Sequence, residues 1–308
     1  MQQGIVIKST GSWYTVADPS GRLRACKLRG RLKLAGSKAT NPVAVGDRVE
    51  FTVEADGGGL IHGILDRKNH IIRKATKLSR QTHVIAANID QAMVIATLAE
   101  PRTSTGFIDR FLVTCEAYSI PATIVFNKID LLESDAARDV LQEFNDIYHL
   151  AGYPCMNVSA IRGDGLSAFA AQLRNKTTLL SGHSGVGKST LINAIEPGLN
   201  LKVQEISSAH LKGKHTTTFA EMIPLSGGGY IIDTPGIKEF GLVDFDPGEL
   251  HHFFPEMQKL FNRCRYDNCT HLNEPGCMVK AHVEEGKISL SRYANYIGML
   301  LGEDRKNL

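Results

Sequence analysis

Apolar and polar residues alternate along the first part of the chain with the period of short β-strands. In the stretch VEFTVEA (49–55), Val49, Phe51 and Val53 alternate with polar residues, as in a strand buried on one face. Turn signals at NPVAVGD and DGGG separate this strand from others. Several short strands that follow each other so closely along the sequence predict a small β-barrel, and the OB-fold is the commonest barrel of this size. The other strand patterns lie in 4–18 (two strands around a Ser-Thr-Gly-Ser turn), 21–30 and 59–66.

The pattern changes after residue 83. Residues 66–82 are basic with weak periodicity, and we interpret them as a linker. Beyond them, apolar runs typical of buried strands alternate with segments of helical spacing, which predicts a parallel sheet with helices on both faces. The remainder, 243–308, is predicted to be mostly helical. We expect strands at 91–99, 122–127, 155–159, 177–181, 218–225 and 229–233, and helices at 106–119, 135–150, 165–173, 188–195 and 288–303.

Positive charge is concentrated near the N-terminus, although the whole chain carries a formal net charge of only +3. Residues 1–75 contain 13 Lys and Arg against 6 Asp and Glu, a net charge of +7, which leaves −4 for residues 76–308. Such a charge excess favours a phosphate-rich partner such as RNA, while a solvated basic surface without a partner remains an equal alternative. The N-terminus has no secretory signal pattern and no apolar run is long enough for a transmembrane helix, so we expect a cytoplasmic protein.

A phosphate-binding loop follows the strand expected at 177–181. The stretch GHSGVGKST fits the pattern G-x-x-x-x-G-K-[ST] and opens a predicted helix, which is the context in which such a loop binds nucleotide phosphates. Lys188 would neutralise the β- and γ-phosphates and serve catalysis, and Ser189 would hold Mg²⁺. The candidate phosphate-binding residues are Gly182, His183, Ser184, Gly185, Val186, Gly187, Lys188, Ser189 and Thr190.

The base is indicated by the stretch FNKID, which ends another predicted strand. Asp130 offers a carboxylate to the paired N–H donors of guanine, whereas adenine would leave that carboxylate without donors. Asn127, Lys128 and Ile129 would brace the base and the loop. Four such residues alone are usually a turn. However, Ser159 and Ala160 end the next strand, and ligands bind where parallel strands end, so GTP is favoured over ATP.

Two further segments have the spacing of γ-phosphate sensors. In DTPG (233–236), Asp233 would hold Mg²⁺ through water and the Gly236 N–H would meet the γ-phosphate. In GKHTTT (213–218), one threonine, such as Thr216 or Thr217, would complete the Mg²⁺ shell. The same threonines also fit the start of a β-strand, and both interpretations can hold.

The group that positions the attacking water is less evident. Many GTPases carry a glutamine after the D-x-x-G motif, but here that position is Ile237, which predicts slow hydrolysis by the protein alone. His215 is the candidate substitute, because histidine can orient or deprotonate water near neutral pH. An exposed loop histidine without a role is the alternative, and His183 is a weaker candidate.

A cluster of metal-ligand residue types lies near the C-terminus. Cys264, Cys269, His271 and Cys277 fall within fourteen residues, and three thiolates with one imidazole suit a structural tetrahedral Zn²⁺. The spacing differs from common zinc fingers, and reduced thiols without metal are the alternative. In a cytoplasmic chain such a cluster favours metal over disulfides.

These motifs occur in the order base reader, second base segment, phosphate loop, switch threonines, D-T-P-G, which is the GTPase order circularly permuted. With the basic barrel before it and the Cys₃His segment after it, the chain resembles the RsgA (YjeQ) family of circularly permuted GTPases that depend on the small ribosomal subunit. The resemblance covers nearly the whole chain, and it places the family's switch histidine at His215. It implies an OB-fold RNA-binding domain over 1–70, a circularly permuted GTPase domain over 83–242 and a zinc-binding domain over 243–308.

The resemblance further implies a late-stage assembly factor. Such a protein binds the 30S subunit and its 16S rRNA, exchanges GTP and GDP, hydrolyses GTP faster when bound, and then leaves. We expect Zn²⁺, Mg²⁺ with GTP, no membrane partner and a monomer. The alternative is an RNA-binding scaffold whose GTPase-like core does not use hydrolysis, which the complete set of Lys188, Ser189 and Asp233 disfavours. A signalling or membrane GTPase is disfavoured by the basic barrel and the absence of an anchor motif.

Overall fold

A computed structural model describes residues 1–30, 42–55, 57–74, 82–199, 201, 220–233 and 247–302. The chain forms two compact units, one of residues 1–92, 167–180 and 195–237, the other of residues 93–166, 181–194 and 238–308. Each unit therefore contains segments that are far apart in the sequence.

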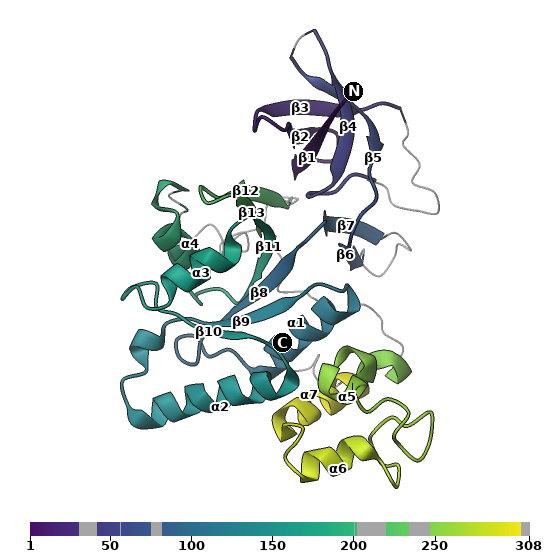
Figure 1. Cartoon of the computed structure of the whole chain (residues 1–308), viewed down its shortest axis with the longest axis vertical. Helices are drawn as coiled ribbons and strands as arrows, with labels where there is room; N and C mark the ends of the chain where they lie inside the picture. Colours follow the sequence, from purple (N-terminus) through teal and green to yellow (C-terminus); the bar gives the residue numbers. More distant parts are fainter. Residues whose placement is uncertain are drawn as a thin grey trace, which may run out of the picture. The chain divides into compact units, whose positions relative to one another are not determined.

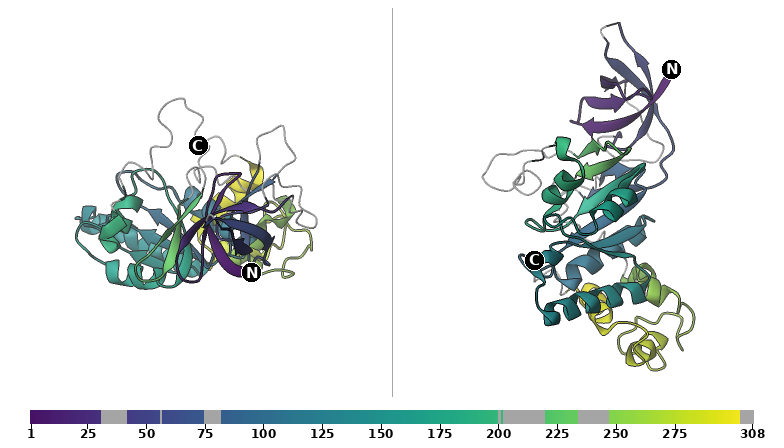
Figure 2. Two further views of the ribbon diagram at one scale, coloured as in Figure 1. Left: turned by 90° about the horizontal axis from the view of Figure 1, so that it is seen from above. Right: turned by 60° about the vertical axis from the view of Figure 1, so that its left-hand side comes forward.

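The first unit begins with a closed five-stranded barrel, drawn in purple and blue in Figures 1 and 2. The strands are ordered β1-β2-β3-β5-β4, and β4 pairs back with β1 to close the barrel. Its core contains Val6, Tyr14, Cys26, Phe51 and Ile61, all at most 1% exposed. The barrel predicted from period-2 alternation is confirmed. Its strands are β1 (Gln2–Ser9), β2 (Tyr14–Ala17), β3 (Leu23–Leu28), β4 (Arg48–Val53) and β5 (Gly59–Ile64).

The segment interpreted as a linker contains a strand. β6 (His70–Lys74) pairs antiparallel with β7 (Thr82–Ala87) in a separate two-stranded sheet, and Ile71 is 4% exposed. The strand was missed because two adjacent isoleucines between basic residues show no alternation. Arg67, just before β6, donates to both carboxylate oxygens of the fully buried Asp47 at 2.7 Å, which anchors the chain as it leaves the barrel.

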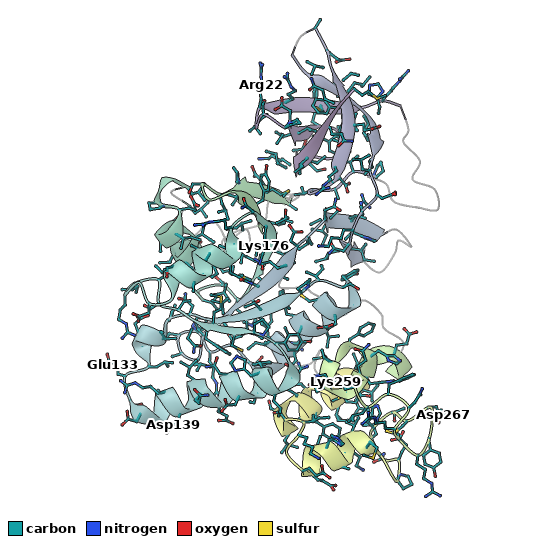
Figure 3. The ribbon with its side chains drawn as sticks, viewed as in Figure 1. Arg22, Glu133, Asp139, Lys176, Lys259 and Asp267 are labelled. Atoms are coloured by element: carbon teal, nitrogen blue, oxygen red, sulfur yellow. The ribbon has the colours of Figure 1, made fainter. Side chains whose placement is uncertain are left out.

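The first unit also holds three strands of the predicted α/β sheet. β11 (Lys176–Ser181) pairs parallel with β13 (Gly229–Asp233), but β12 (Glu221–Pro224) pairs antiparallel with β13. The turn between β12 and β13 is too short for the crossover that a parallel pair needs, so this sheet is mixed. Lys176, labelled in Figure 3 at the start of β11, donates to Gln91 Oε1 at 3.1 Å.

The second unit contains the strands that carry the base-binding motifs. β8 (Gln91–Ala96, whose first two residues fall in the first unit), β9 (Ala122–Phe126) and β10 (Cys155–Asn157) lie in the order β10-β9-β8, with β9 and β10 parallel. Every residue of β8 and β9 is buried, as their unbroken apolar runs predict. The helices of this part are α1 (Thr105–Ala117), α2 (Asp135–Ala151, teal in Figure 2) and α4 (Lys188–Ile195), while α3 (Leu166–Leu173) falls largely in the first unit.

Short helices dominate the C-terminal part of the second unit, as predicted. Leu250, Phe254, Met257 and Tyr296 form its core together with Val113 of α1. Figure 3 labels Lys259 directly after α5 and Asp267 in the loop that follows. Within the described residues, no helix is long and apolar enough to cross a membrane. The elements are a 3-10 helix (Pro247–Phe253), α5 (Pro255–Gln258), α6 (Met278–Glu284) and α7 (Leu290–Leu301).

Candidate nucleotide site and metal centre

The predicted base reader and the phosphate loop contact each other within the second unit. The backbone N–H of Asn127 donates to Ala96 O at 2.8 Å, which fixes Asn127 at the end of β9. Its side-chain Nδ2 donates to Val186 O of the phosphate loop at 2.9 Å. The other amide atom, Oδ1, is buried and has no hydrogen-bond partner among the described residues. Buried polar atoms are rarely left unpaired away from functional sites.

The second base segment contacts the first through Asp130. Ser159 is fully buried, and its hydroxyl donates to Asp130 Oδ1 at 2.5 Å while accepting from the backbone N–H of Arg162 at 3.0 Å. A carboxylate oxygen can accept more than one hydrogen bond, so Ser159 orients Asp130 without exhausting its capacity. Asp130 lies in a 3-10 turn (Ile129–Leu131). Ala160 directly follows Ser159 on the neighbouring loop.

Lys128 adopts a left-handed backbone conformation, with φ of 62°. Such a conformation is uncommon for a residue with a side chain and recurs at functional sites. The Lys128 ammonium donates to the carbonyl of Glu100. Lys128 is therefore held by a loop outside both base-binding motifs.

Two glycines of the phosphate loop are required because neighbouring atoms, a backbone oxygen at one and a side-chain amide at the other, leave no room for a Cβ. A Cβ on Gly182 would lie 2.4 Å from Ile95 O, and one on Gly187 would lie 2.5 Å from Asn127 Nδ2. Both residues also have positive φ, 142° and 90°. Only glycine fits these positions without displacing the loop.

The end of the loop leads into α4, which begins at Lys188. Lys188 Nζ donates to the carbonyls of Gly182 and His183 at 2.5 and 2.8 Å, so the lysine spans the loop. Ser189 is 4% exposed and lies with Thr190 in the first turn of α4. The helix N-terminus favours anionic ligands such as phosphate. His183 packs on Phe107 of α1 with 3.8 Å between ring centroids, and Ser184, Gly185 and Val186 complete the loop.

Several predicted residues cannot be placed in this site. His215, Thr216, Thr217 and Gly236 lie outside the described residues, as does Ile237. Asp233 is the last residue of β13, in the first unit. Their roles remain predictions.

The four predicted metal ligands come together in one cluster. One ligand atom from each of Cys264, Cys269, His271 and Cys277 lies within 4.8 Å of all the others. Sulfur atoms about 2.3 Å from a tetrahedral zinc are about 3.8 Å apart, so this spacing fits the ion. His271 Nδ1 faces the thiols, 3.4 Å from Cys277 Sγ and 3.7 Å from Cys264 Sγ.

The titration of these groups also fits a metal. Burial lowers the pKa of His271, which favours the neutral imidazole that ligates metals. Burial raises the pKa of Cys269 to about 12 and also raises that of Cys277. Thiolates at these buried positions therefore need a nearby cation.

Surrounding groups hold the cluster in shape. Glu274 accepts hydrogen bonds from the hydroxyl and the backbone N–H of Thr270 and from the backbone N–H groups of Leu272 and Asn273. Burial opposes the shift, but the bonds from Thr270 and Leu272 help to lower the pKa of Glu274 to about 2. The hydroxyl of Tyr293 donates to the carbonyl of His271 at 2.7 Å. Such outer contacts orient metal ligands.

Sequence reasoning did not identify the loop that bonds Lys128. Glu100 and Pro101 contact Lys128 and Gly185 respectively, but neither belongs to a recognised motif. Only the position of the loop could have indicated a role in ligand binding. The loop directly follows the buried strand β8, and ligands of α/β sheets bind where such strands end.

Known proteins match this chain over most of its length. A model of the RsgA GTPase family matches residues 64–243, and one of the RsgA N-terminal domain matches residues 3–61. Two relatives are named small ribosomal subunit biogenesis GTPase RsgA. The one from Bacteroides fragilis is 52% identical over 99% of this chain and 97% of its own. The one from Christiangramia forsetii is 48% identical over 98% of this chain and 96% of its own.

Two solved structures have a similar fold. YjeQ from Thermotoga maritima is 38% identical, covers 98% of each chain and superposes with a TM-score of 0.79. YloQ, described as a circularly permuted GTPase, is 31% identical, covers 100% of this chain and 96% of its own, and has a TM-score of 0.76. The predicted fold class and the resemblance drawn from the motifs are both confirmed: the chain belongs to the RsgA family of circularly permuted GTPases.

Proposed function

We propose that this protein binds the small ribosomal subunit late in its assembly and hydrolyses GTP to time its own release. Relatives about half identical over nearly the full chain are named small ribosomal subunit biogenesis GTPases. The basic N-terminal barrel suits an rRNA partner, since Lys and Arg neutralise phosphates. We further propose that the protein acts as a monomer in the cytoplasm.

One observation carries the nucleotide part of the proposal. Asn127 of the base reader donates to Val186 of the phosphate loop, although the two are 59 residues apart and in permuted order. A chance NKID turn would have no reason to meet a phosphate loop. The contact brings the proposed guanine and phosphate sites together in one unit.

The proposed chemistry uses residues of this chain in distinct roles. Asp130 reads the guanine N–H groups, Lys188 neutralises the phosphates, and Ser189 holds the Mg²⁺ that accompanies GTP. Asp233 and one of Thr216 and Thr217 would be further ligands of that ion. The ion supplies charge neutralisation at the phosphates, while His215 orients the attacking water.

We propose a structural role for zinc at Cys264, Cys269, His271 and Cys277. Four protein ligands fill a tetrahedral shell and leave no position for a substrate or a reactive water. The metal would hold together a region whose helices are too short to be stable alone.

The decisive experiment measures GTP turnover by the purified protein alone, with 30S subunits and with 50S subunits. We expect slow turnover alone, strong acceleration by 30S subunits and little change with 50S subunits. GTP binding without acceleration by 30S subunits would favour the scaffold alternative. Binding to 30S subunits that is the same with GDP and with a non-hydrolysable GTP analogue would exclude timed release.

A further inference from the structure

The loop between β8 and α1, residues 97–103, is closed by two buried threonines. Thr97 is fully buried and Thr103 is 1% exposed. The N–H of Thr97 donates to Thr103 Oγ1 at 3.0 Å, and the N–H of Thr103 donates to Thr97 O at 2.8 Å. The Thr97 hydroxyl donates to the carbonyl of Pro101 at 2.5 Å. These three bonds, which we call the threonine clasp, fix both ends and the middle of the loop.

The outer side of the same loop contacts both halves of the nucleotide site. The carbonyl of Glu100 accepts a hydrogen bond from the Lys128 ammonium. The ring of Pro101 lies against Gly185, whose added Cβ would be 3.4 Å from Pro101 Cδ. The loop thus reaches the base reader through one residue and the phosphate loop through the next.

The Lys128 ammonium needs such a partner to be fixed. A lysine side chain has four rotatable bonds, so it loses much rotamer entropy when it is immobilised. A carbonyl at a constant position holds the ammonium at one end, and the left-handed backbone of Lys128 fixes the other. The alkyl chain between them then offers a stationary apolar surface to a flat base.

We propose that the threonine clasp is a positioning element for guanine binding, and that Thr97 and Thr103 act through Glu100 and Lys128. Both side chains are buried within the loop, so they would act without touching the nucleotide. By fixing the Glu100 carbonyl, the clasp keeps Lys128 in its binding position before the nucleotide arrives, which saves ordering entropy on binding. This inference rests on the proposed GTP-binding function and names further residues of the same site.

The test is a double-mutant cycle on the full-length, zinc-loaded protein, with a fluorescent GDP analogue as the probe. Thr97→Val removes the hydroxyl at nearly constant volume, and Lys128→Ala removes the side chain it acts through. We expect Thr97→Val to weaken GDP binding about 5- to 10-fold, the effect of one lost hydrogen bond. In the Lys128→Ala background, Thr97→Val should alter Kd less than about 2-fold. If Thr97 acts through Lys128, the effects of the two substitutions on GDP affinity are not additive.

Matched variants separate positioning from folding. Thr114 is also 1% exposed, and its hydroxyl donates to Arg110 O within α1 at 2.8 Å. Thr114→Val should lower thermal stability like Thr97→Val but leave Kd unchanged. Thr97→Ser keeps the hydroxyl and should restore binding, while Thr103→Val should reproduce the defect.

A hydrogen-exchange measurement on the wild type and on Lys128→Ala does not depend on the threonine variants. GDP should slow hydrogen exchange of the backbone N–H groups of residues 97–100, 102 and 103, and Lys128→Ala should remove most of that protection. Equal effects of Thr97→Val in both backgrounds, or unchanged exchange in 97–103, would overturn the positioning role. If the wild type binds GDP but Thr97→Val binds equally well, only this inference fails. If the wild type binds no guanine nucleotide, the proposed function fails with it.

Discussion

At the scale of single residues, the proposed choice of guanine depends on the orientation of one carboxylate, that of Asp130. Ser159 holds Asp130 by a hydrogen bond of 2.5 Å, and Ser159 is in turn held by the Arg162 N–H. A carboxylate accepts from both N–H donors of guanine, whereas an amide offers one acceptor and one donor. Asp130→Asn should therefore weaken GDP binding by about 2–4 kcal/mol, roughly 30- to 1,000-fold in Kd.

The same substitution should favour xanthosine diphosphate, whose 2-oxo group accepts from the new amide. Titration of the variant with both nucleotides measures the switch. Asp139→Asn, the same change at an exposed carboxylate of α2 (Figure 3), is the control and should bind GDP normally. Equal loss of both nucleotides would mean that Asp130 supports the loop and does not read the base.

The proposed catalytic histidine calls for a different measurement. His215→Ala should slow 30S-stimulated GTP turnover about 10- to 100-fold, the usual range for lost acid–base assistance, and leave GTP binding unchanged. His210→Ala, in the same segment, is the control. Lost GTP binding in the His215 variant would refute the catalytic assignment.

At the scale of elements, the metal loop divides the six cysteines into two groups. Cys26 and Cys115 are buried and Cys155 is half-buried. Burial raises the pKa of all three thiols, that of Cys26 to about 11 and that of Cys155 to about 12. These thiols should resist alkylation in the folded protein, because the thiolate is the reactive form. The thiols of Cys264, Cys269 and Cys277 should depend on the metal for their protection, because its removal should open the loop that buries them.

A chelator should therefore release three fast-reacting thiols from the folded protein, and denaturant should release the rest. Counting reacted thiols by mass spectrometry, with zinc release followed in parallel, checks this prediction. As a control, excess zinc should reverse the chelator's effect. Equal reactivity of these three cysteines with and without chelator would contradict a metal site.

Local patterns predicted most elements but not the contacts among them. The alternation around Phe51 and the unbroken run of β8 identified strands, since each pattern reflects burial of one face or both. β6 was missed because its partner β7, and not its own pattern, gives it strand structure. The bond between Thr97 and Thr103 depends on the path of one loop, and no periodicity encodes it. Motif spacing identified Asp130 and Lys188, but only the fold could show what positions them.

At the scale of the whole molecule, a buried ionic cluster joins the C-terminal helices to α1. Arg292 of α7 donates to Asp109 of α1 at 2.7 Å and to both oxygens of Glu256 of α5 at 2.8 and 3.1 Å. All three side chains are at most 5% exposed. Asp109 and Arg292 are 183 residues apart, so this cluster ties the end of the chain to the base-binding part of the second unit.

Removal of the central cation should be strongly destabilising. Arg292→Met leaves two buried carboxylates without their cation, although Asn295 Nδ2 still donates to Asp109 at 2.6 Å. Breaking such a cluster typically costs about 3–5 kcal/mol. Urea unfolding monitored by far-UV circular dichroism measures the loss of unfolding free energy. Arg138→Met, which breaks an exposed ion pair with Asp135, is the matched control and should change stability by less than about 1 kcal/mol.

The pH dependence distinguishes stranded charges from lost packing. Burial already raises the pKa of Asp109, and Arg292 opposes that rise. Without Arg292 the folded-state pKa rises further above its unfolded value, so the native state holds protons that the unfolded state releases. The variant should then lose stability as pH rises through that folded pKa. Its loss of unfolding free energy relative to the wild type should be smaller at about pH 5 than at about pH 8. A defect independent of pH would instead assign the loss to the packing of the Arg292 side chain against Phe254, 4.7 Å from its guanidinium carbon.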